Sequence, residues 1–303
     1  KKTPAKGKKR SATKKQHTPD YYPVQRTIAL GVEGANLNGN TICDVGKLLS
    51  IQNRRLYRYG KKYNVKIDLN VDITVGADTQ VEVYALADTW DIQRAYALAK
   101  KTYDEAYADE RSTGRGQQAR WSDFRISDGI NSKSLLDPVT YDRDTLAATV
   151  QNEGEFLNSV VDIGGTQTAF VWGASGTGFI SVLEEWDNVG NVDAMPTSNS
   201  TDAPYAGVNS DSMSAIEHTA LATIGNVPPY AQSTSGDIYV KVATLYYRTG
   251  GALTMSKLST GYFDAPCGLV VLKTNSGLGN GQVSMTAKSG DYKGVHALDM
   301  AQG

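Results

Sequence analysis

Residues 60–87, GKKYNVKIDLNVDITVGADTQVEVYALA, contain the clearest alternation of apolar and polar side chains in this chain. The apolar set of the first half is Tyr63, Val65, Ile67, Leu69, Val71 and Ile73. A period of two residues places this set on one face of a long, half-buried β-strand. Turn residues at 76–78 follow, and Val81, Val83 and Ala85 repeat the alternation. We therefore predict an antiparallel hairpin at the centre of an all-β sandwich, covered by other strands.

The rest of the chain favours the same class. Its 303 residues suit one large β domain or two small ones, and 30 Gly and 17 Tyr against 5 Phe favour turns and strands. From residue 144 onward, strand-like segments alternate with glycine-rich turns. Residues 24–33 resemble a first short strand, and residues 48–56 a short amphipathic helix. We expect one β domain over residues 21–303.

Two segments interrupt this pattern. Residues 90–111, WDIQRAYALAKKTYDEAYADER, carry apolar side chains at intervals of three and four, which predicts a helical insertion beside the sheet. Residues 187–214 form the longest irregular stretch and consist mainly of small and polar residues. Loops of this length inside a domain usually serve contact or exposure, so we expect a second insertion there.

The first 20 residues form a basic arm. The cations of this arm are Lys1, Lys2, Lys6, Lys8, Lys9, Arg10, Lys14 and Lys15. These eight charges, without an acidic residue in 1–16, leave 23 basic against 32 acidic residues in the remainder, so an arm of +8 precedes a body of −9. Such a segment cannot fold by burial and is expected to be extended or disordered. It favours neutralisation of a polyanion, with a nuclear-localisation signal or a solubilising tail as alternatives. Because the chain opens on Lys1, we expect it to be part of a longer chain.

A second basic cluster lies just before the long strand. Arg54, Arg55 and Arg58 are its predicted nucleic-acid-binding residues, and Lys61 and Lys62 follow them. Three tyrosines interleave with these cations: Tyr57, Tyr59 and Tyr63. The combination suits nucleotide stacking with phosphate contact. The alternative is tyrosines packed beneath solvated arginines, with salt bridges to the acidic body.

No arrangement of residues points to catalysis. The histidines, His17, His218 and His296, are scattered, and GASGTG at 173–178 lacks the Lys-Ser/Thr of a phosphate-binding loop. Cys43 and Cys267 lack partners at zinc-ligand spacing. We expect no enzyme and no resident cofactor. A structural calcium ion held by the acidic residues Glu184, Glu185, Asp187 and Asp193 is the one metal site considered. No run of 18 apolar residues exists, so no membrane partner is expected.

The stretch NRRLYRYGKKY at 53–63, together with the arm and the β-rich body, resembles capsid proteins of small circular single-stranded DNA viruses of eukaryotes, in particular the bacilladnavirus type. The resemblance implies an eight-stranded jelly roll that assembles with many copies of itself into an icosahedral shell. It also implies an inward-facing arm on the viral genome, which by this resemblance is single-stranded DNA, and a location in the virion, with passage through the host nucleus during assembly.

Two other functional classes fit parts of the sequence. A monomeric single-stranded nucleic-acid-binding protein would use Tyr57, Tyr59 and the basic cluster as a groove. A β-sandwich carbohydrate-active enzyme would stack sugars on Trp172, Trp186 or Tyr205, although the sequence offers no persuasive carboxylate pair. The size of the assembled particle separates these classes from a shell protein.

Overall fold

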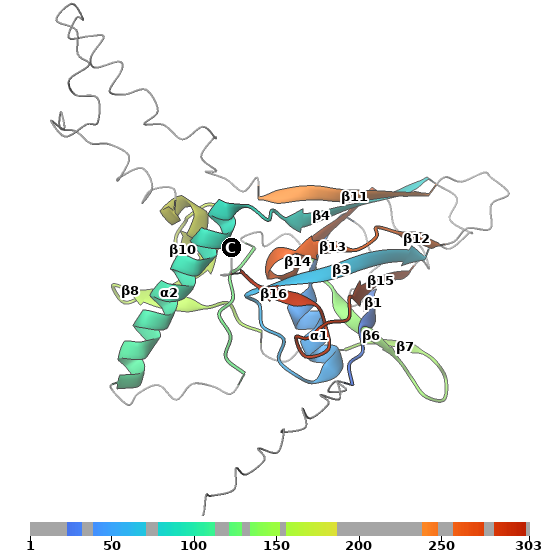
Figure 1. The fold of residues 1–303 in the computed structure, drawn as a ribbon, viewed down its shortest axis with the longest axis horizontal. Helices are drawn as coiled ribbons and strands as arrows, with labels where there is room; N and C mark the ends of the chain where they lie inside the picture. The colour runs from blue at the N-terminus through green and yellow to red at the C-terminus, as the bar shows by residue number, and fades with distance from the viewer. Residues whose placement is uncertain are drawn as a thin grey trace, which may run out of the picture.

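The computed structural model describes residues 23–31, 39–70, 78–112, 121–128, 134–151, 156–186, 238–247, 257–275 and 282–300. These residues form a mainly β fold of largely antiparallel sheets, with helices beside them (Figure 1). The predicted β-rich class is therefore confirmed. The arm at 1–20 and the predicted insertion at 187–214 lie outside the described residues.

Three sheets contain the strands. The eight-stranded sheet follows the order β12 (Lys257–Ser259), β3 (Lys61–Asn70), β15 (Gln282–Ala287), β1 (Thr27–Gly31), β6 (Asp137–Tyr141) and β7 (Ala148–Val150), while β13 (Phe263–Ala265) and β16 (Ala297–Asp299) also pair with β3. The five-stranded sheet follows the order β11 (Tyr239–Tyr247), β4 (Thr79–Leu86), β14 (Leu269–Thr274), β2 (Gly39–Asp44) and β5 (Ser134–Leu135). The three-stranded sheet follows the order β10 (Phe179–Ser181), β9 (Thr166–Val171) and β8 (Val160–Ile163).

The main core lies between the two larger sheets. The predicted inward face of β3 is buried, including Val65, Ile67 and Leu69. These side chains belong to one apolar cluster with Val83 of β4 and Leu272 of β14. The two sheets therefore pack face to face as a sandwich, and the alternation that predicted the buried face of β3 is confirmed. Val71 lies outside the described residues.

The predicted hairpin of β3 and β4 is wrong. β3 pairs with β12, β13, β15 and β16, whereas β4 pairs with β11 and β14 in the other sheet. A hairpin would place the apolar faces of both strands on the same side of one sheet. Here the two apolar faces point into the same core from two different sheets. Alternation reports which face of a strand is apolar and does not identify its hydrogen-bonding partner.

A second apolar cluster covers the outer face of the five-stranded sheet. The predicted helical insertion is confirmed as α2 (Trp90–Ser112), which contributes Ile92, Ala95 and Tyr96 to this cluster. Val271 of β14 and Trp172 of the segment after β9 pack in the same cluster. In Figure 1, α2 lies beside the sandwich together with β8 and β10. α2 and the segment after β9 thus bury the outer face of the five-stranded sheet.

The helix α1 (Val45–Asn53) connects β2 to β3 and begins one turn earlier than the apolar pattern predicts. The carboxylate of Asp44 caps its start and accepts a hydrogen bond of 2.9 Å from the N–H of Lys47. Asp44 also forms a buried ion pair with Arg125, and Lys47 is buried 3.2 Å from Asp137. Burial lowers the pKa of Arg125, but the charge of Asp44, the hydrogen bond to it and the influence of Tyr59 and Asp123 together outweigh burial and raise that pKa. These ion pairs fix α1 and the turn after it.

Candidate nucleic-acid interface

The turn between α1 and β3 exposes all three arginines predicted to bind nucleic acid. α1 ends at Arg54, whose backbone has the left-handed conformation with φ of 51°. Arg54, Arg55 and Arg58 are exposed, and 57% of the Arg58 side chain is accessible to solvent. The structure therefore leaves these three cations accessible on one short turn.

The tyrosines of the same turn are buried, so the predicted nucleotide stacking on Tyr57, Tyr59 and Tyr63 is wrong. Each hydroxyl is hydrogen bonded: Tyr57 donates to the carbonyl of Lys293 at 3.0 Å, and Tyr63 donates to the carbonyl of Arg58 at 2.6 Å. Tyr59 accepts from the indole N–H of Trp172 at 2.9 Å. Burial raises the pKa of all three hydroxyls. These rings anchor the turn and offer no free face to a base.

Gly60 of the same motif also has a packing role. The Tyr96 side chain of α2 occupies the space that a β-carbon at Gly60 would need. The buried tyrosines and Gly60 therefore allow the turn to pack closely against the rest of the fold, including α2. Within 53–63, the exposed charged residues are Arg54, Arg55 and Arg58.

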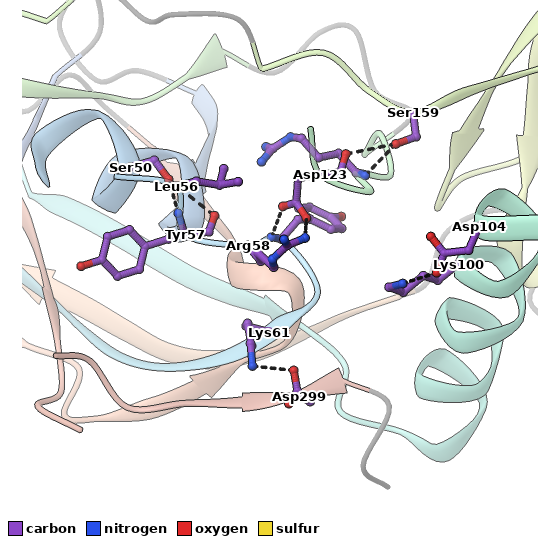
Figure 2. Close-up of polar contacts among 12 residues, drawn as sticks. Ser50, Leu56, Tyr57, Arg58, Lys61, Lys100, Asp104, Asp123, Ser159 and Asp299 are labelled. Carbon is purple, nitrogen blue, oxygen red and sulfur yellow. Dashed lines mark hydrogen bonds and ion pairs between the residues drawn. The ribbon is translucent and has the colours of Figure 1, made fainter. Parts of the chain in front are cut away.

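The two lysines of the cluster are engaged in ion pairs. Lys61 lies 2.5 Å from Asp299 of β16, and Lys62 lies 2.6 Å from Asp88 (Figure 2 shows the Lys61 pair). Both lysines are largely covered. The alternative interpretation, salt bridges to the acidic body, therefore describes Lys61 and Lys62 and also applies to Arg58, which pairs with Asp123. The three arginines remain candidates for a polyanion because their side chains are exposed.

Asp123 supports the turn from the segment that follows α2. Its carboxylate accepts a hydrogen bond of 2.6 Å from the backbone N–H of Tyr59 and lies 3.5 Å from the guanidinium of Arg58 (Figure 2). Only 7% of its side chain is exposed. Burial raises the pKa of Asp123, although Tyr59 and Arg58 act in the opposite direction.

Replacing Asp123 with asparagine should change how stability depends on pH. Because the folded pKa is raised, the contribution of Asp123 to the free energy of unfolding is present below the unfolded pKa and is lost as pH rises through the folded pKa. The Asp123→Asn variant lacks this loss. Its unfolding free energy relative to the wild type, measured in urea titrations, should therefore rise as pH increases from the unfolded pKa of aspartate, about 4, through the raised folded pKa.

Asp142 provides a control of opposite sign. Hydrogen bonds, first from the backbone N–H of Thr145, lower the pKa of this exposed carboxylate. Its contribution is present above the unfolded pKa and is lost as pH falls, so the relative stability of Asp142→Asn should fall as pH rises. Parallel pH profiles for the two variants would contradict the environment described for Asp123.

Lys293 is a cation of this surface that the sequence pattern did not indicate. It lies in the loop before β16, far from the motif in sequence, and its ammonium group donates to the carbonyl of Leu56 at 2.5 Å. Burial, and then the charges of Arg55 and Arg58, lower its pKa. Because Leu56 lies between Arg55 and Arg58 in the chain, this hydrogen bond places Lys293 against the turn that carries the exposed arginines, and we call Lys293 and these arginines the cationic surface. A tertiary contact of this kind leaves no periodicity in the sequence.

The root of the basic arm lies at the same place. The backbone N–H of Gln25 donates to the side chain of Asn53 at 2.7 Å, and the Asn53 amide donates back to the carbonyl of Gln25 at 3.1 Å. Arg26 donates to the carbonyl of Gly294 at 3.4 Å. The chain before Pro23, which includes all eight arm cations, lies outside the described residues. Its attachment point is therefore fixed next to Arg54, at the end of α1.

The alternative sites find less support. Trp172, considered for sugar stacking, is buried, Trp186 packs against Trp90, and Tyr205 lies outside the described residues. Glu184 accepts a hydrogen bond from the backbone N–H of Ser175 at 3.0 Å, and Asp187 and Asp193 are not among the described residues. The described part of the chain contains no group of three or more potential ligands for a metal ion. In the part of the chain that the structure describes, no helix has the length and apolar composition needed to span a bilayer.

Comparison with known proteins gives no match, whether to protein-family models, to curated proteins or to solved structures. The arm root and the exposed arginines beside it are therefore the described features from which a function is inferred.

Proposed function

We propose that this chain is a structural shell protein whose sandwich is a jelly roll. The support is the strand order: β12-β3-β15-β1 in one sheet faces β11-β4-β14-β2 in the other. Along the chain, β1 to β4 alternate between the sheets, and β14 and β15 again lie in different sheets. A jelly roll has eight strands in two packed sheets. In this assignment α2 and β5 to β10 belong to one long insertion between the fourth and fifth strands.

Jelly rolls occur in capsid proteins, lectins and cupins, so the fold alone does not select a function. The observation that carries the proposal is the convergence of two basic elements at one place. The arm carries eight cations and is attached through Gln25 to Asn53, next to the exposed Arg54 and Arg55. The chain after residue 16 has 32 acidic against 23 basic residues, so an arm of net charge +8 joins a body of net charge −9 beside these arginines.

This distribution suits a shell that encloses a polyanion. Clustered cations displace counterions from phosphates without sequence preference. In the proposed assembly the arm and the cationic surface face inward onto the viral genome, single-stranded DNA by the resemblance. The acidic remainder of the chain disfavours nucleic acid elsewhere. The partners are many copies of the same chain, the location is the virion, and no catalytic step is required.

The competing single-strand binder loses part of its basis, because Tyr57 and Tyr59 are buried and hydrogen bonded. Stacking of bases on exposed aromatic rings supplies much of the affinity in that class of protein. The exposed arginines contact phosphates equally well in a shell, where the strand is confined and many copies bind it together.

Assembly is the test of the proposed function. The purified full chain, mixed with single-stranded DNA at low ionic strength, should form uniform closed particles in electron microscopy and sediment as a large homo-oligomer. Treatment with nuclease from outside should leave the enclosed DNA intact. A protein that sediments only as a monomer with bound DNA under all salt conditions would favour the single-strand binder and contradict the shell.

A further inference from the structure

We infer that the α1–β3 turn and the loop before β16 together form a preformed phosphate-binding site, separate from the basic arm. The site consists of Arg54, Arg55, Arg58, Lys293 and Arg26, and its ligand is the phosphodiester backbone of a single strand. We call these five residues the cationic site. The inference deepens the proposed function and rests on it for the identity of the nucleic acid.

The site is held in place before any ligand arrives. The ammonium group of Lys293 donates to the carbonyl of Leu56, while the carbonyl of Lys293 accepts the hydroxyl of Tyr57 at 3.0 Å. The same ammonium group lies 5.8 Å and 5.3 Å from the ring centres of Tyr57 and Tyr292. Two segments distant in sequence are thereby locked together, and Lys293 has little conformational freedom left to lose on binding.

The charges of the site are brought closer than their own repulsion favours. Burial lowers the pKa of Lys293 most, the positive charges of Arg55, Arg58 and Lys61 lower it further, and Asp123 acts in the opposite direction. Nearby carboxylates are already engaged: Asp123 with Arg58 and the Tyr59 N–H, and Asp299 with Lys61. The contact of Lys293 with the carbonyl of Leu56 adds a cation to the turn that carries the exposed arginines, and an anion bound at this turn would offset their mutual repulsion.

The tyrosine rings around the cationic site are buried or packed against one another, and this decides which part of a nucleic acid the site contacts. Tyr57, Tyr59 and Tyr63 are buried, and Tyr292 packs edge-on against Tyr57 and Tyr63. Bases therefore find no stacking surface on this turn, whereas guanidinium and ammonium donors suit phosphate oxygens. The cationic site should bind strands of different sequence with similar affinity.

The first experiment measures binding of the full chain to fluorescent oligo(dT), below the concentration of assembly, over a range of salt. The cluster variant is Arg54→Gln with Arg58→Gln, two exposed positions whose exchange leaves the buried tyrosines intact. The control is Lys100→Gln with Lys101→Gln on α2, which removes the same charge at exposed lysines paired with Asp104 and Glu105. Loss of two phosphate contacts should reduce the slope of log K against log salt by about 1.4 in the cluster variant only. Equal slopes for cluster variant, control and wild type would overturn the inference.

The second experiment follows Lys293 directly by acylation and mass spectrometry. Oligo(dT) should protect Lys293 from acylation, while Lys257, an exposed lysine on β12, should remain reactive. Oligo(dT) and oligo(dA) of equal length should protect alike, and inorganic phosphate at the same phosphate concentration should protect far less. Protection by free phosphate equal to that by the strand, or no protection by either, would overturn the backbone site.

These outcomes are independent of the shell proposal. Suppose that the cluster variant keeps the wild-type salt slope and oligo(dT) does not protect Lys293 from acylation. If closed particles still form and package DNA, only the cationic site is refuted. If the salt slope falls in the cluster variant and oligo(dT) protects Lys293, but the protein never assembles, only the shell is refuted.

Discussion

Deletion of residues 1–16 should empty the particles while leaving the shell able to form. If the eight arm cations contact phosphates of a single strand, each contributes roughly −0.7 to the slope of log K against log salt. Deletion should therefore make this slope shallower by about 5 to 6. The cationic site would remain and would account for the smaller slope that is left. The contacts between subunits belong to the β body and should survive the deletion. The ratio of absorbance at 260 and 280 nm for purified particles, with and without the arm, measures the result.

Two variants of the arm test whether packaging requires its positive charge or its order of residues. Replacement of its eight cations by glutamine keeps the length of the arm and should empty the particles as deletion does. A scrambled order of residues 1–16 keeps the charge and should package normally, because counterion release requires no particular sequence. Unchanged nucleic acid content after deletion would assign the arm to nuclear localisation or solubility and would leave packaging to the cationic site.

Replacement of Leu69 with aspartate should abolish soluble expression. Leu69 is fully buried in the main core, where it lies opposite Val283 of β15 and Leu258 of β12. Loss of a buried leucine costs about 2–5 kcal/mol, and an unpaired buried carboxylate adds several more. The sum is comparable to the whole stability of a typical domain, about 5–15 kcal/mol. Soluble yield and the thermal unfolding midpoint are the measurements.

The neighbouring position provides the control. Asn70 is next along β3, and its side chain is only partly buried. The Asn70→Asp exchange introduces the same carboxylate on the polar face and should change stability by no more than about 0.5 kcal/mol. A soluble Leu69→Asp protein with a midpoint like that of the wild type would mean that the two faces of β3 are reversed.

Local patterns predicted the faces and types of the longest elements. The alternation in β3 identified Val65, Ile67 and Leu69 as core residues, and the three-and-four spacing identified α2. Short elements were harder to predict. β2 contains only Gly39–Asp44 and follows a loop-like run of Gly and Asn, so no alternation marks it, yet it pairs along its whole length with β14.

The candidate site shows the same division. The sequence placed Arg54, Arg55 and Arg58 among tyrosines, and this spacing was compatible with either stacking or packing. Only the fold decides between them, because Tyr59 meets Trp172 and Tyr57 meets Lys293 through contacts between distant segments. Lys293 could not be found from sequence, since it reaches the turn across more than 200 residues.

The sequence by itself therefore determined the properties that depend on neighbouring residues: the faces of β3 and β4, the helix at 90–111, and the separation of a basic arm from an acidic remainder. The tertiary structure alone decided which sheet each strand joins, which aromatic rings are buried and which cations meet at the arm root. The physical reason is that periodicity and composition follow from local backbone geometry and solvation, whereas pairing and burial depend on distant segments. β3 and β4 illustrate both: each face was predictable, but their positions on opposite sides of one core were not.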